Sequence, residues 1–122
     1  MKQFVLIVDD EFGLAEMSAE LLAEDGYDVA IAINGKLALA VMESRKVSLV
    51  LTDLMMPVMD GPEMIRIMRA DPRFAKIPVI LMTALPEALD SAGESLHDAM
   101  LVKPFSVREL LETTRRLLQT SK

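Results

Sequence analysis

Residues 4–11 read FVLIVDDE, in which five consecutive apolar residues are followed at once by three acidic ones. A strand that is buried on both faces is apolar throughout, and polar residues appear only where it leaves the sheet. We therefore expect a central strand over residues 4–8. Asp9 and Asp10 then stand directly at its carboxyl end.

Apolar runs of strand length return four more times, and segments with helical spacing separate them. Such runs predict further strands at residues 27–32, 48–52, 79–82 and 100–102. Helices are predicted at residues 12–24, 34–44, 60–70 and 106–119. The first of these has its apolar residues at Leu14, Met17, Leu21 and Leu22, and the last at Val107, Leu110, Leu111, Leu117 and Leu118.

A fourth helix in chain order is expected between residues 86 and 99. Apolar residues are sparse there and Gly93 falls inside the segment, so we expect this helix to be short or mobile. Good capping residues precede three of the other helices. Asn34 and Asp60 are suited to the N-cap position, Ser106 forms a capping box with Glu109, and Pro62 suits a first turn.

Five strands that alternate with five helices predict an α/β fold with a parallel sheet and helices on both faces. We expect a doubly wound, flavodoxin-like (βα)5 domain with strand order 2-1-3-4-5. In that order the switch point lies between strands one and three, and ligands bind beyond their carboxyl ends. Asp9, Asp10 and Asp53 end those two strands and should share one crevice.

Composition narrows the range of functions. The 122 residues suffice for one domain over residues 1–122, and we expect no effector domain in this chain. A net charge of -6 makes direct nucleic-acid binding unfavourable. No apolar run is long enough to span a membrane. Cysteine is absent and His97 is the single histidine, which excludes disulfides and histidine-rich metal sites. A cytoplasmic protein that acts through protein partners is expected.

Three clustered carboxylates repel one another, and a fold keeps such a cluster mainly when a cation neutralises it. Oxygen ligands in a partly solvated cleft suit Mg²⁺, which shares its remaining positions with water and phosphate. Asp9 and Asp10 by themselves fit equally well a turn that simply ends a strand. Lys103 and Thr83 follow or end two more strands and favour an anion site, although each alone suits a surface lysine or a turn cap.

An aspartate can attack phosphorus once a metal ion and a lysine screen the negative charges. Phosphoryl transfer has a loose, in-line transition state with charge on the equatorial oxygens. Mg²⁺, Lys103 and Thr83 would stabilise that charge, and Asp53 would be the nucleophile. No general base is required, because Asp53 is already ionised.

The chain resembles response regulator receiver domains of two-component signalling, and the resemblance covers nearly all of it. The motifs that carry it are Val8-Asp9-Asp10-Glu11, Thr52-Asp53-Leu54-Met55-Met56-Pro57, Met59-Asp60-Gly61, Thr83-Ala84 and Val102-Lys103-Pro104-Phe105. The resemblance implies that Asp53 accepts a phosphoryl group from a sensor histidine kinase or a histidine phosphotransfer protein. It implies Mg²⁺ held by Asp9, Asp10, Asp53 and the backbone carbonyl of Met55, and a cis Lys103-Pro104 bond.

The resemblance also implies how such a domain works. It would catalyse its own aspartate phosphorylation and slow autodephosphorylation, without being an enzyme in the ordinary sense. It would signal to a downstream protein target or effector domain, either as a stand-alone regulator similar to the single-domain chemotaxis regulators or as part of a longer chain. Helices one, four and five are the faces that the resemblance nominates for these contacts.

Some positions depart from the family pattern. Met100 stands where these domains usually carry an aromatic residue that couples the site to an output face, so we expect a weaker or differently built switch. Only 20 positions separate Thr83 from Lys103, and the usual Gly-Ala pair before the last strand is absent. Met55 and Leu85 are apolar and cannot orient an attacking water, which predicts a long-lived aspartyl phosphate.

Other functions fit less well. A flavodoxin-type flavin binder would require Ser, Thr or Gly donors after the first strand, where Asp9, Asp10 and Glu11 would repel an unscreened phosphate. An aspartate-dependent phosphatase would require a second acid two residues after the first, and a cap domain. A receiver fold that binds partners without phosphorylation remains the serious alternative.

Overall fold

The computed structural model describes residues 2–85 and 96–120, which form a five-stranded parallel sheet. The strand order is β2-β1-β3-β4-β5, as expected for a doubly wound, flavodoxin-like domain. Observed bounds agree with the predicted ones to within a residue. They are β1 (Phe4–Val8), β2 (Asp28–Ala32), β3 (Leu49–Asp53), β4 (Val79–Thr83) and β5 (Ala99–Val102).

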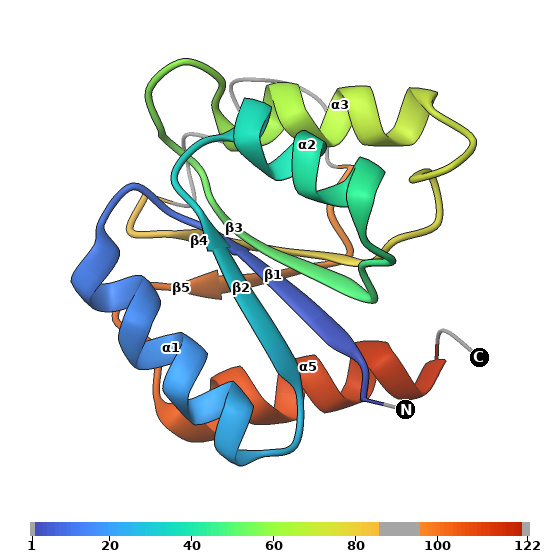
Figure 1. Ribbon diagram of the computed structural model, residues 1–122. Helices are drawn as coiled ribbons and strands as arrows, with labels where there is room; N and C mark the ends of the chain where they lie inside the picture. The colour runs from blue at the N-terminus through green and yellow to red at the C-terminus, as the bar shows by residue number, and fades with distance from the viewer. Residues whose placement is uncertain (1, 86–95, 121–122) are drawn as a thin grey trace.

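Helices cover both faces of this sheet, as Figure 1 shows. On one face lie α2 (Gly35–Ser44) and α3 (Gly61–Ala70), and on the other lie α1 (Phe12–Glu24) and α5 (Val107–Thr120). The sheet separates two apolar clusters, because alternate residues of β1 point to opposite sides: Leu6 belongs to one cluster and Ile7 to the other. Both residues are fully buried.

The expected fourth helix falls mainly on residues 86–95, which lie outside the described residues. At the end of the expected segment, Leu96, His97 and Asp98 are not helical, and Ala99 already belongs to β5.

The capping predictions are confirmed. The Asn34 side chain accepts a hydrogen bond from the Leu37 backbone N–H, and the Asp60 side chain accepts one from Glu63, both at 2.9 Å. At the start of α5 the predicted capping box forms in both directions. The Ser106 hydroxyl accepts from the Glu109 N–H, and the Glu109 carboxylate accepts from the Ser106 N–H, each at 3.0 Å.

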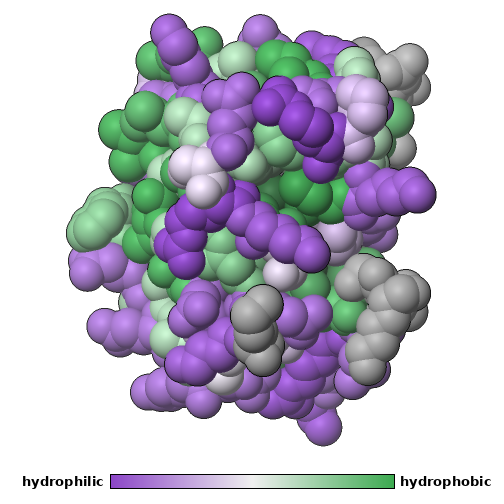
Figure 2. Space-filling view, turned by 45° about the vertical axis from the view of Figure 1, so that its right-hand side comes forward, coloured by the Kyte–Doolittle hydropathy of each residue, from purple (hydrophilic) through white to green (hydrophobic). Residues whose placement is uncertain are grey.

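Helical spacing did not identify every core position correctly. Leu14 and Met17 of α1 are 47% and 61% exposed, and Val107 of α5 is 50% exposed. These side chains line a groove of about 450 Å³ between α1 and α5 and do not enter the core. Apolar spacing marks a face of a helix, but the packing of α5 beside α1 decides how much of that face is covered. Hydrophilic side chains occupy most of the surface in Figure 2, and apolar ones show between them in separate patches.

A buried hydroxyl on α5 also escaped the sequence pattern. Thr114 is fully buried, and its side-chain oxygen has no hydrogen-bond partner among the described residues. A buried polar group that lacks a partner loses its hydration without compensation.

We expect Thr114→Val to stabilise the domain by about 1 kcal/mol, because valine keeps the branched shape and removes the unsatisfied hydroxyl. Urea unfolding of the variant and the wild type measures this difference. The matched control is Thr113→Val at the neighbouring, partly exposed position, where we expect little change. Destabilisation by Thr114→Val would contradict the prediction.

Candidate functional site

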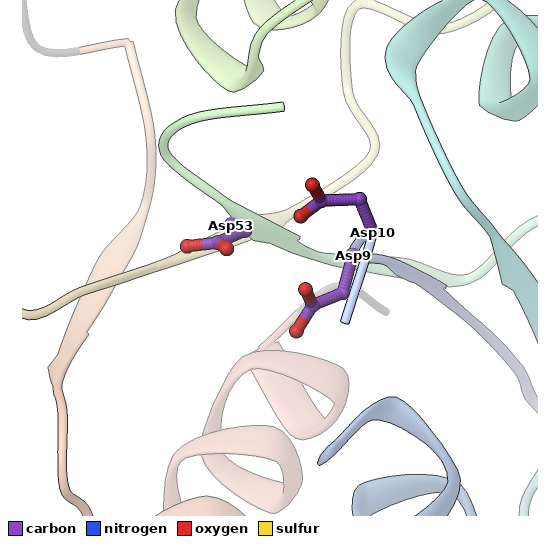
Figure 3. A group of neighbouring side chains, drawn as sticks. All are labelled: Asp9, Asp10 and Asp53. Atoms are coloured by element: carbon purple, nitrogen blue, oxygen red, sulfur yellow. The ribbon is translucent and has the colours of Figure 1, made fainter. Parts of the chain in front are cut away.

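Three carboxylates meet at the carboxyl edge of the sheet. Asp9 and Asp10 follow β1, Asp53 ends β3, and Figure 3 shows their carboxyl groups extending from these adjacent strand ends. One ligand atom from each residue lies within 4.8 Å of the others. Asp9 is buried, Asp53 is partly buried and Asp10 is exposed. The cluster can therefore hold a metal ion that still faces solvent.

The electrostatics of this cluster favour a cation. Burial raises the pKa of Asp9 above its ordinary value, and the negative charges of Asp53 and Asp10 raise it further. Two interactions oppose that rise: the Glu11 backbone N–H donates to Asp9 Oδ1 at 2.9 Å, and the positive charge of Lys103 lies nearby. A bound divalent cation would remove the repulsion that raises the Asp9 pKa.

Lys103 reaches the cluster from the loop after β5. Its Nζ lies 3.3 Å from Asp53 Oδ1, and both side chains are largely shielded from solvent. The Lys103 backbone N–H donates to the Thr83 carbonyl at 2.8 Å, and Lys103-Pro104 is a cis peptide, as the resemblance implied. Lys103 thus faces the same carboxylate that strand β3 presents.

Thr83 ends β4, the neighbour of β3 in the sheet. Its hydroxyl oxygen accepts a hydrogen bond from the Leu85 backbone N–H at 2.9 Å, which leaves the hydroxyl hydrogen available to a ligand. The catalytic and metal-binding roles assigned to the residues of this site stay predictions. The Met55 side chain is 70% exposed in the loop after β3, and Met100, which is 37% exposed, lies on the edge strand β5.

Sequence reasoning placed Gly61 in a motif but missed its contact with Asp53. A Cβ added to Gly61 would lie against the backbone carbonyl oxygen of Asp53, closer than real Cβ atoms approach. The Gly61 N–H also donates to the Leu54 carbonyl at 3.0 Å. The start of α3 therefore packs directly on the backbone that carries the Asp53 carboxylate.

We expect Gly61→Ala to destabilise the domain by about 1–3 kcal/mol, because backbone atoms must move to admit the methyl group. The matched control is Gly13→Ala, where an added Cβ meets nothing within 4 Å and φ is not positive. That helical substitution should stabilise the domain by about 0.5 kcal/mol. Urea unfolding compares the two, and equal effects would contradict this account of Gly61.

Residues 5–115 match the response regulator receiver domain family. The chain belongs to this family. Receiver domains are modules of two-component signalling, and the resemblance drawn from the motifs is thereby confirmed. Over 121 residues, or 98% of its length, this receiver domain is 36% identical to the DNA-binding response regulator MtrA of Mycobacterium tuberculosis. It covers 52% of that relative, and it spans about half the length of the curated relatives it matches.

Solved structures of receiver domains superpose on nearly the whole chain. The receiver domain of a signal transduction histidine kinase from Syntrophus aciditrophicus is 32% identical with a TM-score of 0.92, over 98% of this chain and 92% of that one. The receiver domain of a Pseudomonas aeruginosa sensor histidine kinase is 27% identical with a TM-score of 0.86, over 98% and 99% of the two chains. The latter was solved with a magnesium ion coordinated in its active-site cleft.

The described part of this receiver domain contains no helix that is both long enough and apolar enough to cross a membrane.

Proposed function

We propose that this receiver domain is a phosphoacceptor switch in which the Asp53 carboxylate accepts a phosphoryl group. One observation carries the proposal: the Asp53 carboxylate lies 3.3 Å from the Lys103 ammonium group and belongs to the same cluster as the carboxylates of Asp9 and Asp10. A nucleophilic oxygen, a fixed cation and a cluster suited to a divalent cation thus surround one point.

The transfer follows from these positions. A carboxylate oxygen of Asp53 forms a bond to phosphorus while the bond from phosphorus to the donor's imidazole nitrogen breaks. The nitrogen keeps the electron pair of that bond, and Asp53 releases no proton. Lys103 would bind a phosphoryl oxygen and stabilise the charge on the transferring group, and the Thr83 hydroxyl would donate to another.

Mg²⁺ is the cation that we propose for the cluster, held by Asp9, Asp10, Asp53 and the Met55 backbone carbonyl. Its all-oxygen ligand set and solvent-facing side suit Mg²⁺, which keeps several waters. When bound, it would neutralise the carboxylates and the incoming phosphoryl charge. The magnesium ion reported in the cleft of the Pseudomonas aeruginosa receiver domain supports this choice.

The partners follow from the same chemistry. A phosphohistidine on a sensor histidine kinase or on a histidine phosphotransfer protein is the donor that we propose, and a downstream protein or effector domain is the target. MtrA, a relative of about twice the length, is a DNA-binding regulator, which supports an effector domain as one such target.

Phosphorylation by acetyl phosphate with Mg²⁺, followed by intact mass, tests the proposal. Wild-type protein should gain one phosphoryl group, and Asp53→Ala should gain none. The matched control is Asp60→Asn in the same loop, which keeps the helix cap and should be phosphorylated like the wild type. Absence of an adduct on the wild type would favour the receiver fold that binds partners without phosphorylation.

We expect the aspartyl phosphate to persist well beyond seconds in the presence of Mg²⁺, because the Met55 and Leu85 side chains cannot orient a water for attack. Met55→Asn should shorten its lifetime by roughly tenfold by supplying a polar group that holds a water. Decay of the phosphorylated mass over time measures both. The control is Val58→Asn, an exposed position in the same loop. Loss from the wild type within seconds would contradict the prediction.

A further inference from the structure

Arg69, near the end of α3, donates hydrogen bonds to four acceptors in two other segments of the chain. Its guanidinium group donates to the backbone carbonyls of Ala75, Ile77 and Leu96 at 2.8–3.0 Å, and to the Asp98 carboxylate at 2.8 Å. The side chain is 20% exposed. A planar guanidinium has five N–H donors in a fixed arrangement and can serve four acceptors at once, whereas a lysine ammonium group has only three donors. Arg69 therefore ties α3, the segment before β4 and the approach to β5 together.

The Asp98 carboxylate extends this network into the sheet. Its Oδ2 accepts from Arg69 and also from the Val79 backbone N–H at 2.8 Å, and the Asp98 N–H donates to the Val79 carbonyl at 2.9 Å. Val79 is the first residue of β4, and Ala99, the first residue of β5, follows Asp98 directly. The network therefore lies where the pairing of β4 with β5 begins.

Strand β5 requires such an anchor. It contains only four residues and lies at the edge of the sheet, with β4 as its single partner (Figure 1). A slip of one residue would move every side chain of the strand to the opposite face. Lys103 follows β5 directly, so its approach to Asp53 depends on the register in which Thr83 pairs with Val102.

We propose that Arg69 is a positioning residue for Lys103: through Asp98 it anchors β5 in the register that places the Lys103 ammonium group beside Asp53. Only the expected change in phosphorylation rate rests on the proposed function; the anchoring of β5 does not. The proposed magnesium ligands lie elsewhere: Asp9 and Asp10 follow β1, and Asp53 ends β3. Among the described residues, none of the Arg69 hydrogen bonds reaches these segments. Arg69 should thus affect the lysine and spare metal binding.

Arg69→Met tests this proposal, because methionine keeps an apolar stem and removes every donor. Phosphorylation by acetyl phosphate should slow by roughly tenfold, since a small displacement of a charged group at the reacting centre is costly. The Mg²⁺ dissociation constant, measured by calorimetry, should change by less than about twofold. In a Lys103→Ala background, Arg69→Met should have almost no further effect on the rate, because the residue that it positions is absent.

Two further variants complete the experiment. Asp98→Asn weakens the ion pair but keeps an acceptor for the Val79 N–H, and it should reproduce part of the loss. Arg73→Met is the matched control, because among the described residues Arg73 forms ion pairs only with Asp71 and Glu43, and its side chain is 61% exposed. It should be phosphorylated like the wild type.

Hydrogen exchange of the Lys103 amide, which donates to the Thr83 carbonyl, gives a readout that does not depend on phosphorylation. Exchange should accelerate by roughly tenfold in Arg69→Met. If the wild type takes up no phosphate, the proposed function fails, and this exchange rate alone decides whether Arg69 anchors β5. An unchanged exchange rate, an unchanged phosphorylation rate, or an equal loss in the Lys103→Ala background would each overturn the proposal.

Discussion

Replacing Lys103 by methionine should slow phosphorylation of Asp53 by about a hundredfold, because the variant loses the fixed cation that stabilises charge on the transferring group. Its Nζ lies 3.3 Å from the Asp53 carboxylate, and both side chains are largely shielded from water, where charges interact more strongly than in bulk solvent. The rate of mass gain with acetyl phosphate measures the loss.

Metal binding should respond in the opposite direction. Lys103 places a positive charge beside the three carboxylates, so its removal should leave Mg²⁺ affinity equal to or higher than that of the wild type. Lys76→Met is the matched control: it removes the same charge from an exposed loop position and should leave both quantities unchanged. A Lys103→Met variant that is phosphorylated at the wild-type rate would contradict the assigned role.

Asp10→Asn should weaken Mg²⁺ binding by at least about tenfold, because the site loses one of its charged ligands. Asp10 suits this test better than Asp9. Asp10 is exposed, whereas Asp9 is buried and its carboxylate also accepts the Glu11 N–H, so that replacing Asp9 would disturb the backbone as well. Calorimetric titration with Mg²⁺ measures the affinity.

Asp10→Asn should be more stable than the wild type without metal, and it should gain less stability than the wild type when Mg²⁺ is added. In metal-free buffer Asp10→Asn should raise the melting temperature, because the negative charge of Asp10 is one of those that raise the Asp9 pKa. With Mg²⁺ the wild type should gain more stability than the variant, since tighter binding to the folded state stabilises it more. The control is Glu11→Gln, and an equal Mg²⁺-dependent gain in the wild type and Asp10→Asn would contradict the metal assignment.

The two sets of variants together separate the functions of the site. Loss of Asp10 should weaken metal binding and slow phosphorylation through it, whereas loss of Lys103 should slow phosphorylation without weakening metal binding. Arg69→Met should likewise slow phosphorylation and spare metal binding, although its partner Asp98 lies at the opposite end of β5 from Lys103. Measuring affinity and rate on the same samples distinguishes a lost ligand from a displaced lysine.

Much of the fold could be predicted from sequence, because a doubly wound domain repeats one local pattern. FVLIV at residues 4–8 is apolar throughout since both faces of β1 are covered, and acidic residues follow where the strand leaves the sheet. Local rules also sufficed for the helix caps at Asn34, Asp60 and Ser106, because the partners of a cap lie only three residues away.

The candidate site was predictable for the same reason. Carboxyl ends of parallel strands meet at one edge, so the order of the strands alone brings Asp9, Asp10, Asp53 and Lys103 together. No sequence pattern, however, could show how those residues are held.

Contacts between distant segments decided the rest. Leu14 and Met17 have the spacing of core residues, yet they line an open groove, because burial depends on how α5 packs beside α1. The hydrogen bonds of Arg69 span 6 to 29 residues along the chain, and Gly61 touches the backbone of Asp53 only after α3 has folded onto the sheet. Sequence alone determined which chemical groups stand at the strand ends, since an apolar run and the residues that follow it are local features of the chain. Only the tertiary structure decided which side chains and backbone atoms hold those groups in place, since such contacts exist only once distant segments have packed.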